Sequence, residues 1–277
     1  MSTSTTTPAR RSPAVAGGRR IAALARAETT LLVRNRTALM NAILLPLAFV
    51  GAFAMVADPG GAGADEATTA TAVLAMLVVM GLLFVVYYNL TTAYVARRED
   101  RVLQRLLTGE CTRGEILLAP AVPAAAVVVA QVLVGLAAVT ALLDPPGLVN
   151  PLLVVVGLLG GLAVIGLFAV ATSGLSRTVE SVQLTTLPLV VVMLPFAGMF
   201  TAPGANDGVF GQIARFTPLR PVVELCWLGL AGTDASGRTL TLAETFPAAA
   251  VPVAVLAAWA VVGVLAARRW MRWEPRR

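Results

Sequence analysis

Six apolar runs divide this sequence, and each is about as long as a helix that crosses a lipid bilayer. They extend over Ala38–Val56, Ala67–Tyr94, Ala119–Leu143, Leu148–Leu175, Leu184–Phe200 and Phe246–Ala267. Roughly 20 helical residues cross the hydrocarbon core of about 30 Å. Hydrophobic residues make up 57% of the chain and charged residues 13%, against about 25% charged in soluble domains. The sequence therefore predicts an all-α polytopic membrane protein with six transmembrane helices.

The basic residues indicate how these spans are oriented. All 21 of them are arginine, and most lie before the first run, in the connection after the second run, or in the C-terminal tail. Arginine is enriched in short cytoplasmic loops beside membrane spans. We therefore predict that both termini are cytoplasmic. Because this placement accounts for the net charge of +6, the charge does not indicate a nucleic-acid partner.

The region before the first run contains two different segments. Residues 1–18 are rich in Ser, Thr, Pro and Gly without apolar periodicity, which predicts a disordered tail before a single membrane domain over 19–277. Arg19–Arg36 combines arginines with an apolar side and predicts an amphipathic helix in the cytoplasmic interface. Glu28 lies close to that apolar side, where it either pairs with an arginine or contacts a partner protein.

The connection between the second and third runs combines arginines with leucines. On one helix, Arg98, Arg101 and Arg105 would share a narrow arc, and three leucines would share another. A span would not hold so many arginines, since each costs roughly 2.5–3.5 kcal/mol near the bilayer centre. We therefore predict a surface helix that can dock on another protein. The candidate interface comprises Arg97, Arg98, Glu99, Arg101, Leu103, Arg105, Leu106, Leu107 and Arg113, together with Glu28.

The long loop before the last run contains two short apolar pieces, Val209–Phe216 and Val222–Leu230. Both are too short to span a bilayer, and Pro218 and Pro221 separate them. Non-helical backbone at membrane depth is tolerated where protein covers it. We therefore predict short re-entrant helices in the outer leaflet.

Two features within the runs are candidates for a substrate path. Polar side chains gather in the inner half of the second run, at Tyr87, Tyr88, Asn89 and Thr92. At that depth they face protein or water rather than lipid, so they either line a path or hold helices together. Pro188 and Pro195 predict kinks in the fifth run. These kinks are either structural or mark a span that moves.

Missing residue types exclude several enzyme classes. Without lysine the chain has no Walker-type ATP site, and without histidine it has neither a Ser-His-Asp triad nor an HExxH zinc site. Cys111 and Cys226 lie far apart and are expected to form neither a disulfide nor a metal site. No carboxylate lies clearly at mid-membrane, where an ion-coupled carrier usually has one. We expect no catalytic residue and no cofactor bound by this chain.

The charged connection is similar to a known family pattern. It contains Arg98-Glu99, then Leu103 and Leu106-Leu107-Thr108, then Arg113-x-Glu115-Ile116-Leu117-Leu118. This resembles the R-E-x-G-x-x-x-x-L-x-x-(T/S)-P-x-x-R-x-E-(I/L) segment in the membrane subunit of bacterial type-2 ABC exporters. Arg101 stands where that pattern often has glycine, and Gly109-Glu110 replaces its Thr-Pro turn. Leu194-Pro195 and Phe216-Thr217-Pro218-Leu219 are similar to the family's re-entrant region.

The resemblance implies a transporter built from two membrane subunits and two separate ATPase subunits, which bind ATP and magnesium. The second membrane subunit is another copy of this chain or a paralogue. The Arg97–Thr108 helix and the N-terminal amphipathic helix would dock on the ATPases. A hydrophobic or amphipathic compound, such as a drug or natural product, would leave the cell between the membrane subunits, near the first, second and fifth spans. The implied location is the bacterial plasma membrane. The alternatives are a secondary, ion-coupled carrier and a membrane enzyme or scaffold.

Overall fold

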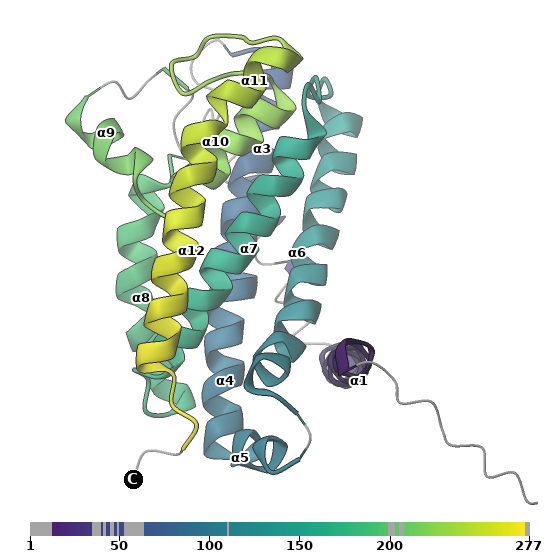
Figure 1. Cartoon of the computed structure of the whole chain (residues 1–277). Coiled ribbons are helices and arrows are strands. Elements are labelled where there is room, and N and C mark those ends of the chain that lie inside the picture. The colour runs from purple at the N-terminus through teal and green to yellow at the C-terminus, as the bar shows by residue number, and fades with distance from the viewer. Residues whose placement is uncertain are drawn as a thin grey trace, which may run out of the picture.

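In the computed structural model, long helices run side by side as a bundle, and α1 lies across one end of it (Figure 1). The structure describes residues 13–34, 40, 43–44, 47–48, 50–52, 64–109, 111–198, 203–204 and 208–274. Over these residues the secondary structure is helical, apart from one isolated β-bridge between Thr233 and Thr239. The all-α prediction is therefore confirmed for the described part of the chain.

Five helices in the described residues are long and apolar enough to span a membrane. They are Glu66–Glu99, α6 (Arg113–Leu142), α7 (Pro151–Ser173), α8 (Val179–Phe196) and α12 (Ala250–Trp270). Each coincides with one of the second to sixth predicted spans, with its ends shifted by a few residues. The first predicted span, Ala38–Val56, lies largely outside the described residues.

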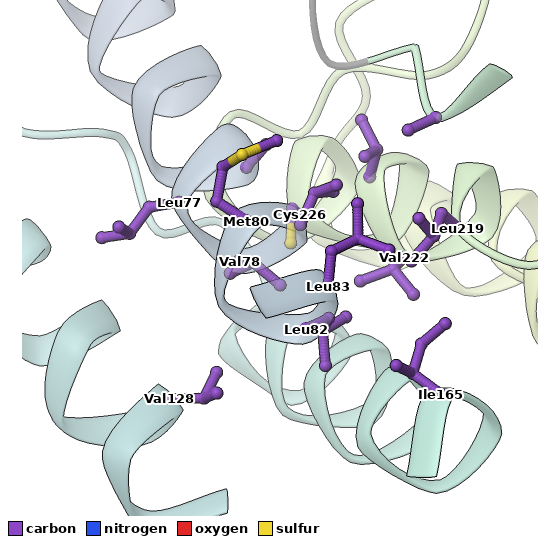
Figure 2. Packing of buried hydrophobic residues seen from close by; sticks show 14 of the residues in the cluster. Leu77, Val78, Met80, Leu82, Leu83, Val128, Ile165, Leu219, Val222 and Cys226 are labelled. Carbon is purple, nitrogen blue, oxygen red and sulfur yellow. The ribbon is translucent and has the colours of Figure 1, made fainter. Parts of the chain in front are cut away.

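The helix Glu66–Glu99 forms the centre of the bundle. It consists of α3 (Glu66–Met80), the π-helix η1 (Gly81–Tyr88) and α4 (Asn89–Glu99). It contacts α6, α7, α8 and α10, and most of its residues are buried. Figure 2 shows Leu82 and Leu83 of η1 in one buried cluster with Val222 and Ile165, which come from two other helices. A helix that is apolar all round is stable only when other helices surround it, as they do here.

Glycines let α7 approach its neighbours closely. A Cβ atom on Gly161 would lie 2.7 Å from Leu82 Cδ1, and one on Gly160 would lie 2.9 Å from Leu256 Cδ1. Both distances are shorter than real Cβ contacts, so only glycine fits without a shift of the leucines. Small residues at such contacts are how membrane helices pack tightly.

In the described part of the connection from α8 to α12 lie three short helices: α9 (Val209–Arg215), α10 (Arg220–Leu230) and α11 (Leu242–Ala248). The first two occupy the predicted apolar pieces and are separated at Pro218. α11, which we did not predict, begins with a capping box. There the hydrogen bond from the Thr241 backbone holds the pKa of Glu244 below its ordinary value.

Helix α10 enters the bundle from one end. Its last turn lies beside Asn150, next to the first residue of α7, and its first turn packs on Gly161. Gly161 is roughly 15 Å along α7 from that end, at 1.5 Å per residue. All residues of α10 except Glu224 are buried. The helix therefore reaches about the middle of the bundle, surrounded by protein.

Helix α1 (Pro13–Arg34) packs on α6. It begins at Pro13, six residues before the predicted Arg19. Proline is favoured in the first helical turn, because it lacks the N–H that would remain unpaired there and its φ angle already suits a helix. Residues 1–12 of the predicted tail lie outside the described residues.

We predict that Gly229→Ala destabilises the protein. The added Cβ would lie 2.8 Å from the carbonyl oxygen of Asn150 and 3.0 Å from the amide nitrogen of Val154, backbone atoms that cannot rotate away. Overpacking of this kind costs about 1–3 kcal/mol, which thermal unfolding of the detergent-purified protein will measure. Gly166→Ala is the control, since no atom lies within 4 Å of its Cβ position. An equal loss of stability in both variants would contradict the packing described here.

Candidate functional site

A buried arginine joins two helices at the end of the bundle that is lowest in Figure 1. Arg98, in the last turn of α4, is only 1% exposed. Its Nη1 donates to the Ser173 carbonyl at 2.7 Å, and its Nη2 donates to the Ser176 carbonyl at 2.6 Å. Helices end with carbonyls that lack intrahelical partners and carry partial negative charge. Arg98 therefore stabilises the C-terminal end of α7 and holds it against the central helix.

The prediction of one continuous surface helix over Arg97–Thr108 is wrong. α4 ends at Glu99, and α5 (Val102–Leu107) begins after a turn in which Arg101 has a φ of 57°. This left-handed conformation is unfavourable for residues that carry a Cβ atom and costs glycine nothing. The pattern that this segment resembles often has glycine at this position. Because of the turn, Arg98 does not share a helix face with Arg101 and Arg105.

Helix α5 divides the predicted interface into accessible and buried residues. Arg101 and Arg105 are exposed, whereas Leu103 is fully buried and Leu106 and Leu107 are half-buried. The leucine side thus packs on the protein, and the arginine side faces outward. The outward side of α5 and of the turn before it therefore presents two arginines, next to the exposed Glu99 and Asp100.

The remaining predicted interface residues lie beside α5. Glu99 is exposed at the end of α4. The guanidinium of Arg113 lies 5.5 Å from the centre of the Trp273 ring, a cation–π contact that joins the start of α6 to the C-terminal segment. Arg97 is half-buried and forms an ion pair with Glu28 of α1. Of the two alternatives for Glu28, the pair with an arginine is therefore present.

A second ion pair fastens α1 to α6. Arg20 Nε lies 3.2 Å from Glu115 Oε1, and Glu115 also accepts a hydrogen bond of 2.7 Å from the Thr112 backbone in the capping box of α6. Since Arg97 belongs to α4, α1 is tied to the helices on both sides of α5. We call this region the basal junction. It comprises Glu28–Arg97, Arg20–Glu115, Arg98 with its carbonyl partners, and α5.

The predicted path residues divide into a buried and an exposed group. Tyr87 is 1% exposed, and its hydroxyl shares a hydrogen bond of 3.0 Å with the Thr172 hydroxyl of α7. Tyr88 and Asn89 are exposed, and the half-buried Thr92 donates to the Tyr88 carbonyl. Tyr87 therefore holds helices together, and Tyr88 and Asn89 remain candidates for a path. They lie where η1 meets α4, and π-helical segments are frequent at functional sites.

Helix α8 is the least buried of the five candidate spans. Leu184 is 76% exposed and Val192 is 61% exposed, so an apolar face of α8 has no partner in the described residues. The helix remains continuous through Pro188 and Pro195, both of which are exposed. This face is wide enough to be covered by another protein or by lipid.

An apolar groove lies between α7, α8 and α12. Its volume is about 720 Å³, and its polar lining is limited to Thr172, Thr217 and Arg269. Near one end Trp259 Nε1 donates to the Phe216 carbonyl at 2.7 Å. Arg269 lies at the opposite end. Neither Pro188 nor Pro195 lines this groove, although other residues of α8 do.

The structure also contains a buried charge pair that we did not predict. Arg220 Nε lies 2.9 Å from Glu224 Oε1, one turn further along α10, and the two side chains are 9% and 11% exposed. This places a carboxylate inside the bundle, within one of the two short apolar pieces of the last loop. The sequence could have indicated this ion pair, because Arg220 and Glu224 have the i, i+4 spacing of a helical ion pair in an otherwise apolar piece.

The described residues offer contacts between helices rather than groups for bond chemistry. Over these ranges, no three His, Cys, Asp or Glu side chains lie close enough to hold a metal ion. Cys226 is buried in the core and Cys111 is half-buried, and both are free thiols. The features that connect separate helices most directly are the ion pairs and carbonyl contacts of the basal junction.

A known family model matches the part of the chain that contains most of these elements. The family model described as ABC-2 type transporter matches residues 18–227, which is more than half of the chain. The match includes the basal junction and most of α10. No curated protein matches the sequence.

We predict that Arg98→Met lowers stability by about 3 kcal/mol. The substitution removes two charge-assisted hydrogen bonds of roughly 1.5 kcal/mol each and leaves carbonyls of the α7–α8 connection without a donor. The temperature of half-unfolding in detergent is the measurement. Arg105→Met removes the same charge from an exposed site and should change stability by less than about 0.5 kcal/mol. Similar losses in the two variants would refute a special role for Arg98.

We predict that Arg101→Gly raises stability by up to about 1 kcal/mol. Glycine adopts the left-handed conformation of Arg101 without strain, although its more flexible unfolded chain offsets part of the gain. Arg101→Ala removes the same charge but keeps a Cβ atom, so it should give no such gain. If the alanine variant is stabilised equally, charge rather than backbone conformation sets the effect.

Proposed function

The chain belongs to the ABC-2 type transporter family, and from this premise we propose that it is the permease subunit of an ATP-driven exporter. It is a multi-pass membrane protein and the transmembrane component of an ABC-2 type transporter. The further proposal is that a separate ATPase subunit binds ATP and magnesium and drives transport. The absence of lysine supports it, because a Walker-type site requires a P-loop lysine.

The basal junction is the observation that carries this proposal. α5 presents the exposed Arg101 and Arg105 at the end of the bundle, and its leucines anchor it to the protein. A helix that is firmly anchored on one side and cationic on the other suits an acidic groove on a partner. We propose that the ATPase supplies this groove.

The contacts around α5 would transmit motion of the ATPase into the membrane. A push on α5 reaches the α7–α8 connection through Arg98, and it reaches α1 through Arg97 and Glu28. The Arg20–Glu115 pair couples α1 to the start of α6. Packed helices with charge-assisted contacts move as units, so several spans would shift together.

We propose that the substrate crosses between two permease subunits, along the exposed face of α8. That face is apolar, and α8 packs against η1 and α4, whose Tyr88 and Asn89 are exposed. An apolar wall with a few polar groups favours a hydrophobic or amphipathic compound. The second subunit is another copy of this chain or a paralogue.

The arginines support a cytoplasmic placement of the basal junction. Figure 1 shows α1, α5 and the C-terminal end at the same end of the bundle. Arginines cluster there, including Arg268 and Arg269 in the last turn of α12. By the positive-inside tendency, we propose that this end faces the cytoplasm of a bacterium whose plasma membrane holds the protein. We further propose that residues 13–277 form one membrane domain.

An ion-coupled carrier is the second candidate, and Glu224 is the observation in its favour. A carboxylate inside the bundle is a usual feature of carriers. However, Glu224 is paired with Arg220 on the same helix, so its charge is already compensated. The charge pair therefore accounts for Glu224 without an ion pathway.

We predict that reversing both charges on α5 uncouples the ATPase. Arg101→Glu combined with Arg105→Glu should abolish co-purification with the ATPase encoded beside this chain, and vanadate-sensitive hydrolysis in liposomes should fall to that of the ATPase alone. Both positions are exposed, so the permease should still insert and purify. Arg238→Glu is the control, because this exposed arginine lies in the loop between α10 and α11.

The two candidate functions give different results in this experiment. A stable complex with the unmodified permease that the α5 variant disrupts supports the exporter. A permease that transports without any ATPase would favour the carrier. A doubly reversed variant that retains ATPase binding and hydrolysis would show that α5 is not the docking surface.

A further inference from the structure

We propose that the groove between α7, α8 and α12 is a binding site for one anionic phospholipid. The phosphate-bearing headgroup lies at Arg269, and an acyl chain lies along the groove toward Trp259. This inference requires that α12 spans the membrane. It does not depend on ATP-driven transport or on an ATPase partner.

The length of the groove matches one leaflet of a bilayer. Along α12 its lining extends from Trp259 to Trp270. At 1.5 Å per residue this is roughly 16 Å, close to half of the hydrocarbon thickness of about 30 Å. The volume of about 720 Å³ is also that of a site for a sizeable ligand. A lipid of the leaflet next to Arg269 therefore fits in extended form.

The polar side chains in the walls of the groove are hydrogen-bonded within the protein. The Thr172 hydroxyl already shares a hydrogen bond with Tyr87, and the Thr217 hydroxyl donates to the Ala214 carbonyl at 2.7 Å. At the end opposite Arg269, the indole N–H of Trp259 donates to the Phe216 carbonyl. The rest of the lining is apolar up to Arg269. Such a surface selects an alkyl chain.

The Arg269 end of the groove is suited to an anionic headgroup. Arg269 is exposed, and among the described residues no carboxylate forms an ion pair with it. Guanidinium binds phosphate through two parallel hydrogen bonds. Trp270 lies beside it, and tryptophan is enriched at the level of lipid headgroups. The charge at one end and the apolar lining therefore match the two parts of a phospholipid.

The packing of α12 on α7 fixes the position of this charged end. The Trp270 carbonyl lies against Gly174, at a place where a Cβ atom would collide with it. Ser173 also contacts Met271 through its hydroxyl. Because the end of α12 is held against the end of α7, Arg269 stands on a rigid support. The site is therefore largely formed before a lipid enters.

The test measures whether anionic lipid is enriched in the groove. A variant with Trp259 as its single tryptophan (Trp227→Phe, Trp270→Phe and Trp273→Phe) is placed in nanodiscs of phosphatidylcholine. Phosphatidylglycerol or phosphatidylcholine with brominated acyl chains is then added in increasing proportion, and quenching of Trp259 fluorescence is recorded. We expect phosphatidylglycerol to reach half of its maximal quenching at a mole fraction at least threefold lower than phosphatidylcholine. Native mass spectrometry of the unmodified chain should show one retained phosphatidylglycerol.

Two pairs of variants separate a specific site from lipid at the general surface. Arg269→Gln should remove the preference for phosphatidylglycerol, whereas Arg268→Gln, which alters the neighbouring arginine outside the groove lining, should keep it. Ala266→Phe should fill the groove and reduce quenching by both lipids, whereas Ala258→Phe, an exposed position outside the lining, should not.

Three results would overturn the proposal. Equal quenching by the two lipids would show that the groove holds ordinary bilayer lipid. An equal loss in the Arg268 and Arg269 variants would show that the preference comes from diffuse surface charge. Quenching that is weak for both lipids in the unsubstituted groove would show that another protein surface, such as a second copy of the chain, covers it.

Discussion

The architecture depends on one guanidinium at the end of its central helix. Helix α7 ends with carbonyls that face the protein interior, where water cannot satisfy them, and Arg98 of α4 supplies donors to those of Ser173 and Ser176. A shorter or uncharged side chain would leave these carbonyls unpaired. The same contact fixes the height at which the central helix ends and hence where α5 emerges. The buried position of Arg98 thus determines which arginines remain on the surface for a partner.

A similar requirement governs α10, which begins inside the bundle. Backbone at that depth must find partners within the protein. The Phe216 carbonyl accepts from Trp259, and the Phe196 carbonyl accepts from the Thr217 hydroxyl. Side chains of neighbouring segments therefore satisfy the irregular backbone between α8 and α10. The buried Arg220–Glu224 pair follows the same logic, because each charge compensates the other on a helix that protein surrounds.

The sequence allowed the five described spans and two of the short helices of the last loop, α9 and α10, to be predicted, because apolar length and proline positions are local properties. The shape of the α4–α5 connection was not predictable in the same way. Helical periodicity assigns side chains to faces only along an unbroken helix. The left-handed conformation of Arg101 changes the direction in which all later side chains of the connection point. The burial of Arg98 depends on carbonyls more than seventy positions away along the chain. The sequence therefore showed which residues make up the candidate site, but it did not show which of them are buried and which are exposed.

The π-helix η1 gives the central helix a property that a uniform α-helix lacks. Its hydrogen bonds run from residue i to i+5, so each turn holds more residues than in α3 or α4. η1 therefore rotates α4 about the helix axis relative to the position it would have in a continuous α-helix with α3. A change of length within η1 alters the angle at which Tyr88 and Asn89 face outward while α3 keeps its packing. The position of η1 within the span therefore sets which side chains of α4 face outward and which, like Arg98, face α7.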